Sequence, residues 1–137
     1  MTQEDKELLL KDLCARLPYG VKVEYKNEIF DVEHVSPMYE EVKLDTYETW
    51  TVGVSDIKPY LFPLSRLNSL TDEQKKTLKV LCDWNDEEAD AQSILVLYQK
   101  HFVMKSDVID WLHKNHFDYR GLIPMGLAED ATDKNIY

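Results

Sequence analysis

The sequence contains little glycine and no long hydrophobic run. Four glycines and five prolines among 137 residues exclude collagen-like and low-complexity chains. They also leave few places where a backbone loop could wrap a phosphate. The longest apolar run covers only residues 94–98, far short of the roughly 20 residues that a membrane-spanning helix needs. We therefore expect no membrane partner.

Basic side chains are also scarce. The chain has 16 Lys and Arg against 26 Asp and Glu, which gives a formal net charge of −10. Proteins that coat nucleic acid need clustered Lys and Arg to contact phosphates, so we expect no direct nucleic-acid binding. The acidic balance leaves one indirect role open, because carboxylates spaced like phosphates can occupy the basic cleft of another protein.

Patterns typical of enzymes are absent as well. The sequence has no Gly-x-Ser-x-Gly turn, no glycine-rich phosphate loop and no His-Glu-x-x-His helix. It therefore favours a protein that is not an enzyme, and we expect no cofactor.

The two cysteines, Cys14 and Cys82, are predicted to be buried free thiols, with a disulfide or a reactive thiol as alternatives. The acidic N-terminus lacks a secretory pattern, which favours a cytoplasmic location.

The hydrophobic pattern predicts one α+β domain over residues 1–137, a length that can bury a sizeable core without metal or disulfides. Residues 1–18 are typical of a helix, because Thr2 and Asp5 match a capping box and Pro18 follows the end. Its apolar stripe consists of Leu9, Leu10, Leu13, Cys14 and Leu17.

Residues 19–64 alternate between apolar and polar, which predicts antiparallel strands. Four short strands are expected near residues 21–25, 29–35, 46–54 and 57–62, with Ser36 and Pro37 ending the second. Pro59 suits an edge strand better than a central one. Because no helix separates these strands, we expect a curled meander or a small, partly open barrel, against which the first helix packs.

Residues 71–123 are predicted to be mainly helical. Thr71 and Gln74 form a second capping-box pattern, and Ser106 is the expected cap of a later helix. Residues 91–104 fit either a helix or a buried strand, and we favour the helix. Residues 83–90 form an acidic connection, which we expect to be a solvated loop rather than a calcium site. The tail over residues 126–137 is expected to be loose.

The densest polar group of side chains lies in residues 110–121. His113 and His116 share a helical face and Asp118 follows, so these three residues are weak candidates for a divalent metal site. In the alternative interpretation Trp111 anchors the end of a helix, and the histidines interact with its dipole.

Arg120 offers a second possibility in the same segment. Its guanidinium could bind a carboxylate or another anion, with Tyr119 stacked beside it. The alternative is a local salt bridge and a turn at Gly121. The candidate binding residues are Trp111, His116, Asp118, Tyr119 and Arg120.

Three stretches carry a resemblance to a known family. They are DLCARLPYGV at residues 12–21, IKPYL at 57–61, and DWL at 110–112 followed by HFDYRGLI at 116–123. The chain resembles a family of uncharacterised small proteins from Bacteroides-type gut bacteria and their phages or prophages. Residues 72–105 match only in general character, and the residues after Gly126, Leu127 and Ala128 depart from the family. The resemblance implies a cytoplasmic, phage-linked accessory protein and transfers no catalytic residue.

The leading hypothesis is a non-enzymatic module that binds a protein partner. Two alternatives remain: an acidic nucleic-acid mimic that inhibits a host DNA-handling or defence enzyme, and a metal-assisted hydrolase that uses His113, His116 and Asp118.

Overall fold

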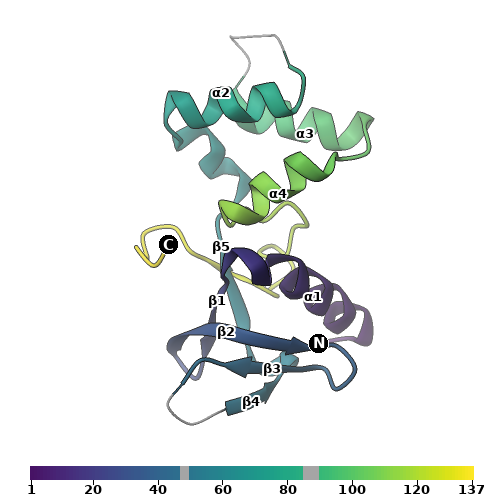
Figure 1. Cartoon of the computed structure of the whole chain (residues 1–137), viewed down its shortest axis with the longest axis vertical. Helices are drawn as coiled ribbons and strands as arrows, with labels where there is room; N and C mark the ends of the chain where they lie inside the picture. The colour runs from purple at the N-terminus through teal and green to yellow at the C-terminus, as the bar shows by residue number, and fades with distance from the viewer. Residues whose placement is uncertain (47–49, 85–89) are drawn as a thin grey trace.

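The protein has an α+β architecture, as the sequence predicts. A computed structural model describes residues 1–46, 50–84 and 90–137. Figure 1 shows the sheet and α1 at one end of the molecule and α2, α3 and α4 at the other.

The α-helices are α1 (Gln3–Arg16), α2 (Asp72–Leu81), α3 (Ala91–His101) and α4 (Ser106–Lys114). The strands are β1 (Lys22–Tyr25), β2 (Glu28–Ser36), β3 (Glu41–Leu44), β4 (Trp50–Gly53), β5 (Lys58–Leu61) and β6 (Glu129–Asp130). Short 3₁₀ helices are η1 (Leu17–Tyr19), η2 (Val54–Asp56) and η3 (Leu64–Ser69).

Helix α1 begins at the predicted capping box. The Thr2 hydroxyl accepts a hydrogen bond from the Asp5 amide at 3.1 Å, and the Asp5 carboxylate accepts one from the Thr2 amide at 3.2 Å. The prediction for Cys14 is wrong, because this thiol is exposed and only Cys82 is buried. The buried face of α1 instead runs through Asp12 and Arg16, so the stripe is rotated away from Cys14.

The strands form one open six-stranded sheet in the order β4-β3-β2-β1-β5-β6. Neighbouring strands are antiparallel except for β5 and β6, which are parallel. Strand β2 pairs with β1 through its first half and with β3 through its second half, and the register shifts between Val32 and His34. The expected curled meander or partly open barrel is therefore wrong: the two edge strands do not meet.

Two strand predictions also need correction. Strand β3 was missed, although Val42 and Leu44 alternate with polar residues and are both buried; its four residues are too few for the pattern to stand out. The predicted strand over residues 46–54 is described only in part, because residues 47–49 lie outside the described residues. Within it, β4 begins at Trp50.

Strand β5 is not an edge strand, although it contains Pro59. It pairs with β1 on one side and with β6 on the other. The pairing with β1 uses Lys58 and Pro59, whereas the pairing with β6 uses Tyr60 and Leu61. Pro59 therefore pairs only with β1, and its missing N–H does not interrupt the hydrogen bonds between β5 and β6.

The helical region agrees well with the sequence pattern. Helix α2 starts at the Thr71–Gln74 capping box, and α3 confirms the favoured helical interpretation of residues 91–104. The acidic connection over residues 83–90 lies largely outside the described residues. The expected Ser106 cap is wrong: α4 has Lys105 at its N-cap, without a side-chain cap.

The C-terminal tail is packed rather than loose. Leu127, Ala128 and Ala131 are buried, and β6 extends the sheet. The Tyr137 hydroxyl donates to the Tyr60 carbonyl at 2.8 Å and accepts from the Lys22 amide at 2.9 Å. Short-range sequence patterns did not reveal this order, because the hydrogen-bond partners of β6 and of the Tyr137 hydroxyl lie about 70 to 115 residues earlier in the chain.

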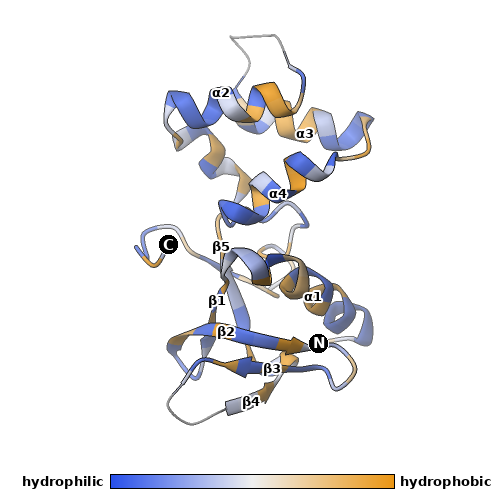
Figure 2. Ribbon diagram, in the orientation of Figure 1, coloured by the Kyte–Doolittle hydropathy of each residue, from blue (hydrophilic) through white to orange (hydrophobic). Residues whose placement is uncertain are grey.

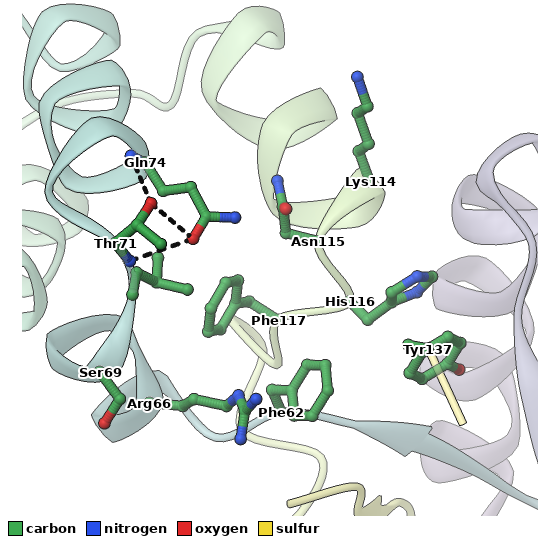
Figure 3. Close-up of a pocket in the computed structure, with 11 residues that line it drawn as sticks. Phe62, Arg66, Ser69, Thr71, Gln74, Lys114, Asn115, His116, Phe117 and Tyr137 are labelled. Atoms are coloured by element: carbon green, nitrogen blue, oxygen red, sulfur yellow. Dashed lines mark hydrogen bonds between the residues drawn. The ribbon is translucent and has the colours of Figure 1, made fainter. Parts of the chain in front are cut away.

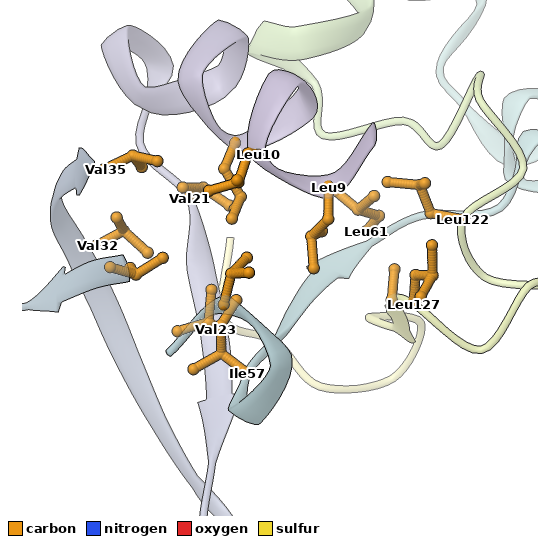
Figure 4. Close-up of a cluster of buried hydrophobic side chains, with 14 of the residues drawn as sticks. Leu9, Leu10, Val21, Val23, Val32, Val35, Ile57, Leu61, Leu122 and Leu127 are labelled. Atoms are coloured by element: carbon orange, nitrogen blue, oxygen red, sulfur yellow. The ribbon is translucent and has the colours of Figure 1, made fainter. Parts of the chain in front are cut away.

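Buried hydrophobic side chains form two clusters. The first joins α1 to the sheet and includes Leu9, Val23 and Leu61 (Figure 4). The second joins η3 to α2, α3 and α4 and includes Leu78 and Leu95. Figure 2 shows hydrophobic and hydrophilic residues side by side on these helices, as expected for amphipathic helices. No helix among the described residues is long and apolar enough to cross a membrane. The single-domain interpretation stays a prediction.

Candidate functional site

The end of α4 fixes the position of His116. The Phe117 amide donates to the Leu112 carbonyl at 2.9 Å, and the His116 amide donates to the His113 carbonyl at 3.1 Å. This pair of bonds is a Schellman motif, whose C′ residue adopts a left-handed conformation. His116 occupies that position with φ of 63°, although glycine is the usual residue there. The motif turns the chain sharply and sets His116 and Phe117 beside the helix end.

The next residues form a turn organised by Asp118. Its two carboxylate oxygens accept hydrogen bonds from the amides of Leu122 and Ile123, both at 2.9 Å. Its own amide donates to the Phe62 carbonyl at 2.8 Å. Asp118 is buried, and both of its oxygens are occupied, so its role in the fold is structural.

A buried ionic network lies between the two clusters. The Asp12 carboxylate accepts hydrogen bonds from Arg16 Nε at 2.8 Å and from Arg120 Nε at 3.0 Å. Arg16 also donates through Nη2 to the Phe117 carbonyl at 2.7 Å. Asp12 and Arg16 are fully buried. The network therefore ties α1 to the turn that follows α4, over more than 100 residues of sequence.

Tyr119 and His113 extend this network. The Arg16 and Arg120 guanidinium carbons lie 5.6 Å and 4.9 Å from the centre of the Tyr119 ring. The Tyr119 hydroxyl is 2.8 Å from His113 Nε2. Burial and the Arg16 charge lower the pKa of His113, because both disfavour a charged imidazolium. Tyr119 and Arg120 thus contact groups of this chain rather than an open surface.

The weak metal candidates are not brought together. His113 is engaged by Tyr119, while the oxygens of Asp118 accept from backbone amides. Among residues 1–46, 50–84 and 90–137, no group of three His, Cys, Asp or Glu side chains is placed to hold a metal ion. Trp111 packs face to face on Phe117, with ring centres 5.8 Å apart, as the helix-anchor interpretation predicts.

A pocket lies between η3, the start of α2 and the end of α4. Its volume is about 370 Å³, within the range of small-molecule sites. One wall is formed by η3 and the start of α2 and consists of Arg66, Ser69, Leu70, Thr71 and Gln74. The other wall is the end of α4, with Lys114, Asn115, His116 and Phe117. Phe62 and Tyr137 complete the lining. Figure 3 shows Arg66 extending toward Phe62, while His116 lies over Tyr137.

The charge of this pocket is opposite to that of the whole chain. Its lining contains Arg66 and Lys114 but no Asp or Glu. The ion pairs within the described part of the chain involve neither residue. Arg66 instead lies over the Phe62 ring, with its guanidinium carbon 4.3 Å from the ring centre. Two basic residues without a carboxylate partner in the described part of the chain therefore contribute to the lining, and Figure 3 shows the Lys114 side chain extending away from Arg66.

His116 and Tyr137 form an uncharged part of the lining. Their rings stack with centres 3.5 Å apart and an interplanar angle of 12°. Burial, followed by the charges of Arg16 and Lys22, lowers the pKa of His116 to about 4. Burial raises the pKa of Tyr137 to about 12, because its hydroxyl end is enclosed while the side chain remains 40% exposed. Near neutral pH the pocket charge comes from Arg66 and Lys114 alone.

Sequence reasoning found one member of this pocket, His116, and missed Arg66 and Lys114. Arg66 stands in an unremarkable stretch between two predicted elements, and nothing near it in the sequence signals a site. Lys114 lies inside the predicted segment, but its relation to Arg66 depends on how α4 packs against η3. The available signal was indirect: both residues are basic in an acidic chain.

Comparisons with family models, curated protein sequences and solved structures find no match to this chain. The resemblance to a small-protein family of gut bacteria and their phages therefore stays a prediction from the quoted motifs.

Proposed function

We propose that this chain is a non-enzymatic binding module that engages a protein partner through the basic pocket between η3 and the end of α4. The observation that carries the proposal is a pocket lined by two basic residues, Arg66 and Lys114, neither of which pairs with a carboxylate of the described residues, in a chain of net charge −10. Unpaired cations in a concave site favour a ligand of negative charge. The partner therefore presents an acidic segment.

Arg66 takes the role that the sequence suggested for Arg120. Arg120 donates to the Asp12 carboxylate, so it has a charge partner within the chain. Arg66 has an aromatic ring beneath it, and this contact holds the guanidinium without occupying its N–H groups. Arg66 is thus oriented in advance to bind a carboxylate by two parallel hydrogen bonds.

Aromatic side chains add apolar surface to the pocket. Phe62 lies between Phe117 and Tyr137, with ring centres 6.2 Å and 5.9 Å away. Interfaces are enriched in aromatic residues and arginine, which often supply most of the binding energy. The combination favours a peptide segment that carries an acidic group next to an apolar side chain.

The other two functions have no specific support. Several carboxylates near the sheet pair with lysines on neighbouring strands, as in Lys22–Asp31 and Lys43–Glu33. Because lysines lie between these carboxylates, this part of the surface does not present the unbroken row of negative charges that a nucleic-acid mimic needs. The hydrolase hypothesis required His113, His116 and Asp118 to act together, and each has a different neighbour in the fold.

The test is affinity capture from a host-cell lysate with four matched baits. These are the wild type, Arg66→Gln, Lys114→Gln and the control Lys11→Gln, which removes an exposed lysine of α1. We expect wild type and control to capture the same protein saturably, and both pocket variants to lose at least about tenfold in affinity.

Because His116 stays neutral, binding should be unchanged between about pH 6 and pH 8.

Two results would contradict the proposal. One is a captured protein whose affinity is the same for all four baits, since the pocket would then play no part. The other is an absence of saturable capture by the wild type under repeated conditions. If a partner is captured, its binding to the purified wild type should weaken as the salt concentration rises. Binding that is insensitive to salt would also count against an acidic segment.

A further inference from the structure

Three aromatic side chains meet on the face of the sheet that carries the first hydrophobic cluster. Phe30 of β2 pairs across strands with Val23, which is fully buried. Trp50 of β4 pairs in the same way with Leu44, which is also fully buried. Paired residues of antiparallel strands point to the same face, and Tyr25 shares that face because it is two residues from Val23 in β1. Trp50 is nevertheless 42% exposed, so the core reaches the surface at these rings.

Two of the rings form walls of a pocket. Its volume is about 390 Å³, within the range of small-molecule sites. The Tyr25 and Trp50 ring centres are 6.5 Å apart, and the ring planes meet at 68°. Phe30 packs against both rings, with centres 6.3 Å and 6.0 Å away. We call Tyr25 and Trp50 the aromatic corner; the rest of the lining consists of Lys26, Thr51 and Val52.

A cation of the chain already lies over one wall of this corner. Lys26 Nζ is 5.3 Å from the centre of the Tyr25 ring, which is a cation–π distance. The turn between β1 and β2 holds the lysine backbone beside that ring, because Lys26 and Asn27 have φ of 49° and 66°, as in a type I′ turn. Lys26 is exposed, and the ion pairs of the described residues do not include it. Its ammonium group can therefore be displaced.

We propose that the aromatic corner binds a methylated ammonium group, which replaces the Lys26 ammonium over the Tyr25 ring. Because the Tyr25 and Trp50 ring centres are 6.5 Å apart, one cation can lie within about 6 Å of both. The formal net charge of −10 also favours a cationic ligand. This site shares no lining residue with the pocket between η3 and the end of α4, so it is independent of the proposed function.

Methylation determines the outcome of the competition with Lys26. A primary ammonium group is compact and strongly hydrated, so it loses favourable hydration when it moves onto an aromatic ring. A trimethylammonium group is larger and less strongly hydrated. Its methyl groups pack on the apolar surface of Trp50 and Val52, while its charge still interacts with the ring faces. The corner therefore favours a choline-like group over an unmodified lysine side chain.

The test is a calorimetric titration of the folded protein, with amide and indole chemical shifts to locate the site. The probes are choline, its uncharged analogue 3,3-dimethyl-1-butanol, and a short peptide with one trimethyllysine beside the same peptide unmodified. We expect choline to shift the Trp50 indole N–H and to bind at least about tenfold more tightly than the uncharged analogue. Tighter binding of the modified peptide would indicate a methylated protein as the source, and tighter binding of choline a free small molecule; either supports the site.

Two substitutions act on the site in opposite directions. Trp50→Leu removes one ring and should weaken choline binding about tenfold or more. Lys26→Gln removes the competing cation and should strengthen choline binding about two- to fivefold. The matched controls are Tyr39→Leu, which removes an exposed aromatic ring between β2 and β3, and Lys11→Gln, which changes the net charge equally. Neither control should alter the affinity.

Several results would overturn the site. One is equal binding of choline and its uncharged analogue, and another is the absence of any shift in β1 and β4 with every probe. A third is an affinity that is unchanged in Lys26→Gln or that rises equally in Lys11→Gln, since the effect would then be one of general charge. Circular dichroism identifies a variant that fails to fold. If Trp50→Leu does so, the gain in Lys26→Gln carries the test, because a misfolded protein does not bind more tightly.

Discussion

Buried charge is the main feature of this protein at the scale of single residues. Asp12 and Arg16 are fully buried on α1, in positions where the sequence pattern predicts no burial of charge. Charged groups are costly to bury unless they are paired and hydrogen-bonded. Asp12 meets this requirement by accepting from both Arg16 and Arg120, and the network therefore depends on its carboxylate.

We expect Asp12→Asn to lower the free energy of unfolding by about 3–5 kcal/mol, because it leaves two guanidinium groups without a counter-charge. The matched control is Asp31→Asn, which removes an exposed carboxylate from the Lys22–Asp31 pair and should cost about 0–1 kcal/mol. Chemical denaturation of the three proteins measures the difference. Equal losses in the two variants would show that the buried network is not important for stability.

Helix ends determine the candidate site at the scale of secondary-structure elements. Helices α2 and α4 both end with left-handed residues other than glycine, Asp83 and His116. At the end of α4 this conformation turns the chain so that Phe117 stacks on Trp111 and His116 stacks on Tyr137. The side chain at position 116 therefore has a packing role, which compensates for an unfavourable backbone conformation.

The two contributions of His116 can be separated by substitution. His116→Ala and His116→Gly both lose the stack on Tyr137, but only glycine adopts a positive φ without a steric cost. We expect the glycine variant to be more stable than the alanine variant by about 1 kcal/mol, as measured by thermal or chemical unfolding. If alanine is the more stable of the two, the left-handed conformation at the end of α4 is not retained in solution.

Two hydrophobic clusters are joined at the scale of the whole molecule. The sheet and α1 share one cluster, and η3, α2, α3 and α4 share the other. The connections between them include the bond from Arg16 to the Phe117 carbonyl and the backbone bonds of Phe62 to His116 and Asp118. Such buried connections favour unfolding of both clusters in one transition.

A substitution in one cluster tests this coupling. Leu78 is fully buried in the helical cluster, and Leu78→Ala should cost about 2–5 kcal/mol. If the clusters unfold together, hydrogen exchange should become faster in β1 and β2 as well as in α3. Val80→Ala is a suitable control, because Val80 lies on the same helix and is 68% exposed. Faster exchange confined to the helical cluster would show that the two clusters unfold separately.

The sequence by itself determined the elements whose signals are local. Capping boxes at Thr2 and Thr71 placed the starts of α1 and α2, and periodicity favoured the helix over residues 91–104. These signals work because their hydrogen bonds and apolar stripes join residues only three or four positions apart.

The tertiary structure alone decided the open sheet, the docked tail and the candidate pocket. The structure brings together residues about 50 to 100 positions apart in the parallel pairing of β5 with β6, in the burial of Arg16 against Phe117, and in the pocket that both Arg66 and Lys114 line. No local pattern specifies which distant residues become neighbours, because that depends on how the complete elements pack. The same reason explains why the anion anchor was expected at Arg120, beside the dense polar segment, whereas the free guanidinium is that of Arg66.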